Sequence, residues 1–286
     1  MTAELPAPEL RPVRPTDRPR VVEITEEVWD GNDYLPSVFD LWVTDPGGQF
    51  QAAELEGMLV GVHRVRPIGP GVVLYEGLRV DAGYRRRGLA RAMVRQAMAD
   101  AARQGFQEMR VTTGDEAGER LFEGEGFEAR ARSRRWTAPR REGGDPPRLA
   151  SGADAGRLAR VVAGDATGAA YGGVLAGWQG PLDVDAALIE RMADDGWVRL
   201  GPGGRAFALL LQPGRDRLVV GFIAGVGAAL DELLEALRFE ADSQALGGVT
   251  LWLPDPYPAA DHITAVGYHL EDESTRCTAY VRRLMQ

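Results

Sequence analysis

Three consecutive arginines, Arg85, Arg86 and Arg87, stand between an apolar strand pattern and an apolar helix pattern. Gly88 follows them directly, and Gly83 lies just before them. Such a turn can direct several backbone N–H groups at one point, and the start of the next helix adds the positive end of its dipole. The spacing therefore predicts a diphosphate site, with an ordinary exposed basic loop as the alternative.

The flanking elements must hold this turn in place. Leu78 and Val80 alternate as in a strand that ends just before the turn. After Gly88 the apolar residues recur at helical spacing, which predicts a helix from about Gly88 to Gln104. The apolar positions of that helix are Leu89, Ala90, Met93, Val94, Ala97 and Met98.

The rest of the N-terminal half predicts an α/β domain with a mixed, mainly antiparallel sheet flanked by helices. Thr16 is the expected N-cap of a first helix that runs to about Trp29, and Pro36 lies in the first turn of a second helix. The expected strands are 10–13, 50–55, 58–65, 72–80, 109–113 and 127–136, with a short helix at 116–123.

A Pro- and Gly-rich stretch at 138–147 has the composition of a linker. The elements that follow it repeat the order of the first half, so we expect two tandem domains, residues 1–143 and 144–286, the second a degenerate copy of the first. The matching strand-to-helix junction, Ala224–Ala229, contains no arginine. The sequence thus predicts one basic turn and one catalytic half.

Two motifs of the first half resemble those of the GCN5-related N-acetyltransferase superfamily. Arg85, Gly88 and Ala90 match the family pattern of Arg or Gln, two residues, Gly, one residue, then Gly or Ala. The segment Leu121–Phe127, with the sequence LFEGEGF, is similar to the family's LYEKLGF signature. The resemblance covers about residues 9 to 137 and implies the acyl-CoA N-acyltransferase fold.

The resemblance implies acetyl-CoA as the acetyl donor. The backbone amides of Arg86, Arg87, Gly88, Leu89 and Ala90 would hold its pyrophosphate, and the Arg85 side chain would add charge. The strand residues Leu78, Arg79 and Val80 would line the pantetheine arm in a gap between this strand and the next, and the Val80 N–H would polarise the thioester carbonyl.

An amine attacks a thioester as the free base, so a group must accept its proton. Glu76 is the candidate, because alternation along a regular strand would place its side chain on the same face as Leu78 and Val80. A solvent-facing strand glutamate is the alternative. Together Glu76 and Val80 form the predicted catalytic pair.

Two positions depart from the family pattern. Phe122 stands where the family's proton-donating tyrosine is expected, and a phenyl ring cannot donate a proton. Tyr75, Tyr84 and Tyr34 are substitutes to consider, unless the thiolate leaves unaided. Asp115 replaces the family's asparagine near the pantetheine arm, and Asp115 and Phe122 complete the expected coenzyme contacts.

In this fold the acceptor pocket is formed by the first two helices and their connection. Trp29, Asp33 and Tyr34, together with Glu76, are the expected acceptor-binding residues, and their acidic and aromatic character suits a cationic or aromatic amine. A capped loop with a hydrophobic staple is the alternative. The string Asp33-Tyr34-Leu35-Pro36, with Phe39 and Trp42 after it, has a short similarity to histidine N-acetyltransferases.

Composition excludes several classes. A net charge of −9 argues against non-specific nucleic-acid binding. The chain has no apolar run long enough for a membrane span and no signal-peptide pattern, and its single cysteine, Cys277, excludes an intramolecular disulfide. The histidines His63, His262 and His269 lack partners at zinc-ligand spacing, so no metal is expected. We therefore expect a cytoplasmic protein, a monomer or a homodimer.

These expectations favour an N-acetyltransferase that transfers the acetyl group to a primary amine of a small molecule by direct attack in a ternary complex. A protein or peptide N-acetyltransferase is one alternative. A non-catalytic acyl-CoA-binding module is another, suggested by Phe122 and Asp115.

Overall fold

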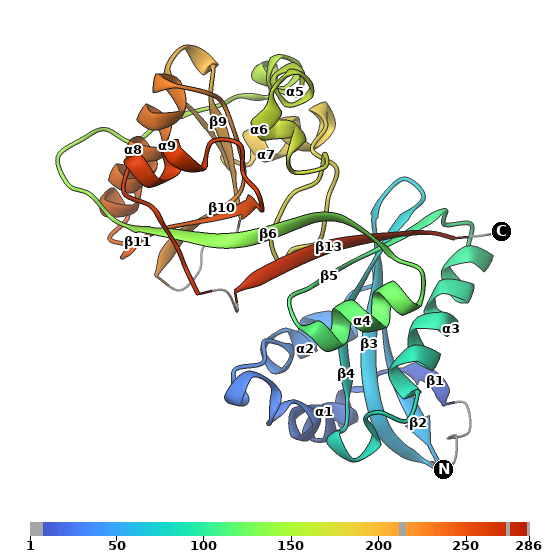
Figure 1. Cartoon of the computed structure of the whole chain (residues 1–286). Helices are drawn as coiled ribbons and strands as arrows, with labels where there is room; N and C mark the ends of the chain where they lie inside the picture. The colour runs from blue at the N-terminus through green and yellow to red at the C-terminus, as the bar shows by residue number, and fades with distance from the viewer. Residues whose placement is uncertain (1–7, 212–215, 273–274, 285–286) are drawn as a thin grey trace. The chain divides into compact units, whose positions relative to one another are not determined.

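The computed structural model describes residues 8–211, 216–272 and 275–284, with the side chains of Trp29 and Asp30 outside that description. The chain forms two compact units (Figure 1). The first contains the described residues up to Val111, together with Arg120–Glu128 and the chain from Val281. The second contains Thr112–Glu119 and Ala129–Tyr280.

The first unit has a mixed, mainly antiparallel sheet. Four strands pair as antiparallel neighbours in chain order, and a fifth runs parallel to the fourth. They are β1 (Glu9–Pro12), β2 (Gln49–Leu55), β3 (Met58–Gly69), β4 (Val72–Val80) and β5 (Glu108–Thr113). The helices are η1 (Pro15–Asp17), α1 (Arg18–Thr25), η2 (Val28–Gly31), α2 (Leu35–Thr44), η3 (Ala82–Tyr84), α3 (Leu89–Arg103) and α4 (Glu116–Gly124).

Each face of this sheet buries a separate cluster of apolar side chains. On one face, Leu35 and Phe39 of α2 pack against Val62 of β3. On the other, Leu89 and Met93 of α3 pack against the same sheet. Since successive strand side chains point to opposite faces, one sheet positions two different helical layers.

The first helix differs from the prediction at both ends. Asp17, not Thr16, is the N-cap of α1, and Asp17 Oδ2 accepts a hydrogen bond of 2.7 Å from the Arg14 backbone N–H. The helix ends at Thr25, and the Trp29 backbone belongs to the short η2. An acidic side chain two residues from Pro15 can bond back to the chain, which starts the helix later than apolar spacing suggests.

The second unit repeats this strand order. Strands β7 to β10 are antiparallel neighbours, and β11 runs parallel to β10. The strands are β6 (Glu128–Pro139), β7 (Arg148–Leu149), β8 (Val198–Leu200), β9 (Phe207–Leu210), β10 (Arg217–Ala224), β11 (Gly248–Pro254), β12 (His269–Leu270) and β13 (Arg276–Arg283). The helices are η4 (Gly152–Asp154), α5 (Ala155–Gly164), α6 (Ala166–Ala169), α7 (Ala186–Asp194), η5 (Pro202–Gly204), α8 (Ala228–Ser243) and α9 (Ala260–Ala265).

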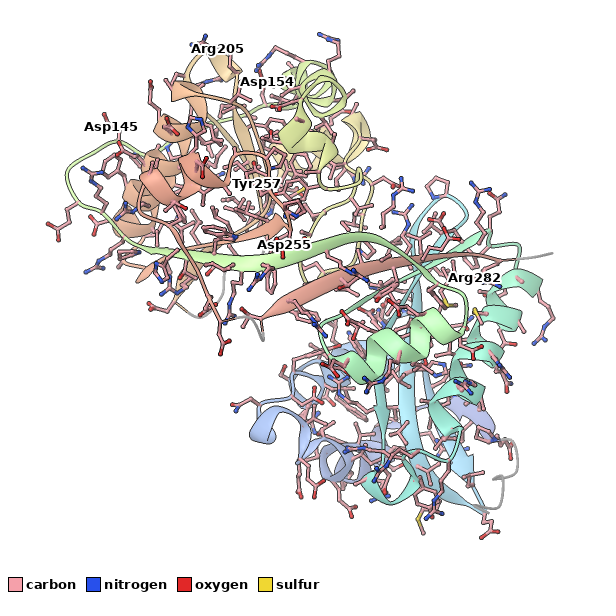
Figure 2. All side chains as sticks on the ribbon, in the orientation of Figure 1. Asp145, Asp154, Arg205, Asp255, Tyr257 and Arg282 are labelled. Carbon is pink, nitrogen blue, oxygen red and sulfur yellow. The ribbon has the colours of Figure 1, made fainter. Side chains whose placement is uncertain are left out.

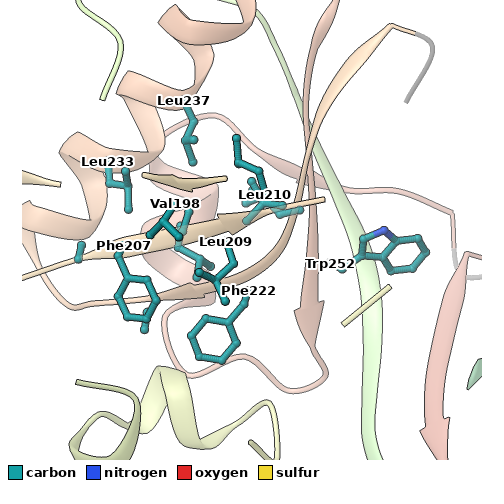
Figure 3. Close-up of a cluster of buried hydrophobic side chains, with 14 of the residues drawn as sticks. Val198, Phe207, Leu209, Leu210, Phe222, Leu233, Leu237 and Trp252 are labelled. Atoms are coloured by element: carbon teal, nitrogen blue, oxygen red, sulfur yellow. The ribbon is translucent and has the colours of Figure 1, made fainter. Parts of the chain in front are cut away.

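The core of the second unit lies where α8 meets its sheet. Leu233 and Leu237 of α8 belong to one buried cluster with Phe207, Leu209 and Phe222 of the strands (Figure 3). All five side chains are fully buried. Because both halves have the same strand order, the predicted internal repeat is confirmed at the level of topology.

The two compact units do not follow the sequence halves at their last strands, β6 and β13. Seven residues of β6, ending at Pro139, pair antiparallel with β11 in the second unit. The end of β13 belongs to the first unit, where Arg282 (labelled in Figure 2) donates to the Gly126 carbonyl at 2.9 Å and Leu284 N–H to Gln107 O at 2.8 Å. The division at residue 143 therefore stays a prediction about the sequence halves, since β6 from Ala129 belongs to the second unit and only the end of β13 belongs to the first.

Two negative findings concern the described part of the chain. None of its helices has both the length and the hydropathy needed to cross a membrane. Its His, Cys, Asp and Glu side chains form no group of three or more that could hold a metal ion.

Candidate active site

The basic turn is anchored at its first residue. The Asp81 N–H donates to Val60 O at 2.9 Å, and Asp81 Oδ1 accepts from the Gly83 N–H at 2.7 Å. The same carboxylate forms an ion pair with Arg20 of α1. The turn therefore starts from a fixed position at the end of the sheet, although the arginines that follow are exposed.

Two left-handed residues shape the turn before α3. Arg86 has a φ of 60° and Gly88 a φ of 83°, and Gly88 is the N-cap of the helix. A Cβ atom at Gly88 would meet nothing within 4 Å, so space is open in front of this cap. The first N–H groups of a helix have no acceptor within the helix. The turn and the start of α3 thus have the backbone geometry of an anion site, and binding of a diphosphate by residues Arg86 to Ala90 stays a prediction.

The three arginines of the turn are not equivalent. Arg85 Nε donates to the Val80 carbonyl at 2.9 Å, so this side chain caps the end of β4. The Arg87 guanidinium lies over the Tyr84 ring, 5.8 Å from its centroid. The bond therefore holds the positive charge of Arg85 beside the end of β4, where the thioester is expected.

Strands β4 and β5 separate where the gap was expected. Their parallel pairing covers Val72–Glu108, Val73–Met109 and Leu74–Arg110. Beyond Leu74, β4 continues to Val80 with no further β5 partner among the described residues. The parted ends leave one side of β4 available to an extended ligand.

The Val80 N–H points to that side. The next residue, Asp81, donates its N–H to β3, and alternate residues of an antiparallel strand direct their N–H groups to opposite sides. The Val80 N–H therefore points away from β3, where β5 has separated. This direction fits the predicted role as a donor to a thioester oxygen.

A β-bulge changes which side chains share a face of β4. Val62 and Arg64 of β3 are partners of Arg79 and Glu76, so one intervening residue of β3 opposes two of β4. Gly77, with a φ of 66°, lies inside this bulge. Glu76 and Arg79 consequently share one face, because their partners on β3 are two residues apart.

The expectation that Glu76 shares a face with Leu78 and Val80 is therefore wrong. Leu78 and Val80 pack with the cluster of Leu89 and Met93 on the α3 side. The bulge turns Glu76 to the opposite side, which α1 and α2 cover. The candidate base thus lies on the face that was predicted to receive the amine.

Glu76 is held by two arginines that were not singled out in the sequence. Its Oε1 accepts from Arg64 Nη1 at 2.7 Å and from Arg66 Nε at 2.8 Å. Arg64 is buried, and its guanidinium lies 4.8 Å from the centroid of the Trp42 ring. Both of these bonds use one carboxylate oxygen, so Oε2 is the atom that would receive a proton.

Asp33 and Arg79, predicted for different ligands, lie together. Arg79 Nε and Nη2 donate to the Asp33 carboxylate at 2.5 and 3.0 Å, and the Asp33 side chain is 1% exposed. Asp33 Oδ1 also accepts from Leu35 N–H at 3.0 Å. A carboxylate with these partners positions α2 and Arg79, so its contact with an amine stays a prediction.

Tyr34 is the exposed member of this group. Its side chain is 40% exposed, and the Arg79 guanidinium lies 5.5 Å from the ring centroid. Crowding around the hydroxyl removes solvent and raises the pKa of the Tyr34 phenol to about 12. The phenol is therefore neutral at physiological pH. The Trp29 side chain, also predicted to bind the acceptor, lies outside the described residues.

The acidic character expected of the acceptor region is largely neutralised by arginine. Asp33 pairs with Arg79, Glu76 pairs with Arg64, and Asp40 pairs with Arg18 at 2.9 Å. Composition could not reveal these pairs, because the arginines lie on other elements. The region is therefore polar and close to charge balance rather than strongly acidic.

Asp115 precedes α4, whereas Phe122 lies within it. Asp115 Oδ1 accepts from the Gly118 N–H at 2.7 Å, which caps the start of the helix. Phe122 is buried, and its ring lies 6.0 Å from Tyr75 and 5.3 Å from Phe127. A coenzyme contact for either residue remains a prediction.

A separate hollow of about 570 Å³ lies beside the last turn of α3, where Asp100, Arg103 and Gln104 line it. Helix α3 has 15 residues, so its two ends are separated by roughly 22 Å. The basic turn lies at the opposite end. This hollow is therefore distinct from the basic turn, but Trp42 and Asp45, which contact Arg64, also line it.

Strands β4 and β5 that part, the Val80 N–H that points away from β3, and the turn that precedes α3 define an acyl-CoA N-acyltransferase fold. Residues 17–127 match the model of the Acetyltransferase (GNAT) family. Over this segment the chain is similar to the GNAT family.

A human protein described as Probable N-acetyltransferase 16 is 34% identical over 103 residues, which make up 35% of this chain and 28% of that protein. The match thus covers only a small part of that relative's length.

Two solved structures resemble the chain over nearly its whole length. The GCN5-related N-acetyltransferase from Sphaerobacter thermophilus has a TM-score of 0.62 at 13% identity and covers 99% of this chain and 98% of its own. A tandem GNAT protein from the clavulanic acid biosynthesis pathway has a TM-score of 0.58 at 15% identity and covers 97% and 99%. At these identities the likeness shows the fold alone.

Proposed function

We propose that this protein is an acetyl-CoA-dependent N-acetyltransferase that acetylates a primary amine of a small molecule by direct attack in a ternary complex. The parting of β4 from β5 beyond Leu74 carries the proposal, because it leaves the Val80 N–H facing the gap. The Gly88 cap of α3 supplies a diphosphate site at the end of the same strand.

The coenzyme supplies a thioester whose carbonyl carbon accepts the amine. The amides from Arg86 to Ala90 bind the pyrophosphate, and Leu78 and Val80 line the pantetheine arm. As the amine adds, negative charge develops on the carbonyl oxygen, and the Val80 N–H donates to it. Arg85, bonded to the Val80 carbonyl, stabilises the same charge from nearby.

Glu76 accepts the proton that the amine loses, directly or through one water molecule. The bulge at Gly77 supports this role, because it directs Glu76 to the face covered by α1 and α2. Arg64 and Arg66 hold the carboxylate through Oε1. Tyr34, the exposed member of the neighbouring group, contacts the acceptor.

A small polar amine fits this charge-balanced region better than a strongly cationic peptide does. The short similarity of residues 33–42 to histidine N-acetyltransferases places amino acids among the acceptors to test. The lone Cys277 is buried, which agrees with work in a reducing compartment such as the cytoplasm.

Phe122, which has no hydroxyl at the expected donor position, and Asp115 favour a second candidate, an acyl-CoA-binding module without turnover. A release assay for free CoA separates the two readings, using acetyl-CoA with a panel of amino acids, polyamines, aromatic amines and basic peptides. We expect release with one class of small amine. Release only with peptides would support the protein-acetylating alternative, and acetyl-CoA binding without release from any amine would support the binding module.

A further inference from the structure

Tyr75 carries a buried hydroxyl without a hydrogen-bond partner in the described part of the chain. The residue is 1% exposed. Leaving a buried hydroxyl unsatisfied is unfavourable, so such a group in a native fold calls for an explanation. A bound ligand that accepts from this hydroxyl would provide one.

The position of Tyr75 connects it to the coenzyme gap. Leu74 is the last residue of β4 paired with β5, so Tyr75 is the first residue of the parted segment. Its ring lies 6.0 Å from Phe122, in an edge-on contact. Tyr75 therefore belongs to the same aromatic cluster as Phe122, which stands where the family's tyrosine is expected.

The neighbouring His63 has no free N–H with which to donate a hydrogen bond to a ligand. Its ring lies 5.1 Å from Tyr75, and its Nε2 bonds to Gln51 Oε1 at 3.0 Å. Because that oxygen is an acceptor, Nε2 carries the hydrogen and Nδ1 is left as an acceptor without a partner among the described residues. Full burial lowers the pKa of His63 to about 3, so the ring is neutral.

The other two tyrosines considered from the sequence are engaged elsewhere. The Tyr84 hydroxyl donates to Met58 Sδ at 3.6 Å, on the outer side of the turn. Tyr34 lies beside Arg79, on the face opposite to Leu78 and Val80. Of the three, Tyr75 alone adjoins Phe122 and the parted strands.

We propose that the Tyr75 hydroxyl donates a hydrogen bond to the sulfur of the departing coenzyme A thiolate. This inference rests on the proposed function. The amine nitrogen forms a bond to the carbonyl carbon and loses a proton to Glu76. The C–S bond then breaks with its electron pair on sulfur, and the Tyr75 O–H stabilises that charge. The thiolate takes a proton from water as it leaves, so Tyr75 keeps its own.

The chemistry of the phenol suits this role. Burial raises the pKa of Tyr75 well above its usual value, so the hydroxyl remains a donor throughout the reaction. A hydrogen bond to a charged group is stronger than one between neutral groups. The contact is therefore made mainly after the C–S bond has begun to break.

Tyr75→Phe is the test, because it keeps the ring and removes one oxygen. We expect kcat to fall roughly 10- to 100-fold while KM for acetyl-CoA is unchanged. The melting temperature should stay the same or rise, since an unsatisfied hydroxyl is removed. Wild-type kcat in this variant, or an equal loss of coenzyme binding, would overturn the proposal.

Phe122→Tyr provides the rescue, because it returns a hydroxyl from the facing ring. The double variant Tyr75→Phe/Phe122→Tyr should recover most of the lost kcat. No recovery in a folded double variant that binds acetyl-CoA normally would count against a shared position for the two hydroxyls.

A product complex tests the contact without turnover. Titration of the thiolate absorbance of bound coenzyme A should show a thiol pKa about one unit higher in Tyr75→Phe than in the wild type. Equal values would refute the hydrogen bond even if the enzyme is active. If the thiol pKa differs between the two proteins but the wild type acetylates no amine, the Tyr75 contact is retained and the proposed function is rejected.

Discussion

The two strand-to-helix junctions of the molecule share a topology and differ in what fills the gap. In the first unit β4 leads into α3, and in the second β10 leads into α8. Strand β10 pairs with β11 from Arg217 to Val220 and then continues to Ala224, so this pair of strands also separates. Glycines at the bulges, Gly77 in β4 and Gly221 in β10, occur in both.

In the second unit two tyrosine hydroxyls bond to the backbone of β10 and β11 where these strands part. The Tyr171 hydroxyl accepts from Ile223 N–H at 3.2 Å and donates to Trp252 O at 3.1 Å. Tyr257 (labelled in Figure 2) donates to Ile223 O at 3.1 Å. The N–H that Val80 directs into the gap thus has a counterpart at Ile223 that bonds to a tyrosine of the protein.

The turn beyond β10 also lacks the features of an anion site. Gly225 N–H donates to Thr167 Oγ1 at 3.1 Å, and no arginine lies between Ala224 and Ala229. Strand parting is therefore common to both junctions. An open backbone donor and an exposed basic cap accompany it only at the first junction, to which the proposed function assigns the coenzyme.

The largest expected effect comes from Gly88→Glu. A carboxylate at this cap would face the pyrophosphate, and repulsion over a few ångströms should weaken coenzyme A binding roughly 100- to 1000-fold. Titration calorimetry would measure it, and wild-type stoichiometry should be one coenzyme A per chain.

Gly105→Glu is the matched control for this variant. Gly105 follows the other end of α3, with a φ of 87° and nothing within 4 Å of the position that a Cβ would take. Its backbone strain would be similar to that at Gly88, so normal binding is expected. Equal loss in both variants would attribute the effect to strain, and a second coenzyme A per wild-type chain would break the contrast between the junctions.

Glu76→Gln should lower kcat roughly 100-fold and change coenzyme A affinity little, because it removes the proton acceptor but keeps the shape. Steady-state kinetics across pH would show it. Asp45→Asn is the control, since Asp45 also pairs with Arg64. If Glu76→Gln retains wild-type turnover at all pH values, another group is the base.

Tyr171→Phe should destabilise the second unit by about 1–3 kcal/mol, because it leaves Ile223 N–H and Trp252 O without their partner. Tyr75→Phe, which removes an unpartnered hydroxyl, should cause no such loss. Urea unfolding of the two variants measures the difference directly. Equal stability losses would mean that the two hydroxyls are used alike, and the comparison of the gaps would fail.

A further expected effect concerns pH and the neutral His63. Its folded pKa of about 3 lies below the usual 6.5, so the unfolded chain binds the extra proton first. Stability should therefore decrease as pH falls from 6.5 toward 3, by up to about 1.4 kcal/mol per pH unit. His63→Gln should reduce this slope, whereas the exposed His269→Gln should not. An unchanged slope in His63→Gln would show that His63 is not buried in its neutral form.

Local patterns in the sequence predicted the donor side of the site. Apolar spacing located α3 within one residue at each end, because its buried face repeats with the helical period. The turn from Asp81 to Gly88 was recognisable because its function needs backbone geometry that glycine adopts readily. Strand order likewise followed from the succession of elements in each half.

The acceptor side could not be read in this way. The face on which Glu76 lies depends on one extra residue in the bulge at Gly77, where a Cβ would come within 2.6 Å of the Trp42 ring. The arginines that pair with Glu76 come from the neighbouring strand, and the partner of Asp33 lies 46 residues away. Such pairings depend on strand register, which composition does not reveal.

The sequence by itself determined that one junction carries the basic cap and that a tyrosine is missing at Phe122. Only the tertiary structure decided which hydroxyl stands beside that ring, and that Tyr171 closes the second gap. The physical reason is the same in both cases. A cap is built from consecutive residues, whereas a buried hydroxyl acquires its role from backbone groups that folding brings to it from distant strands.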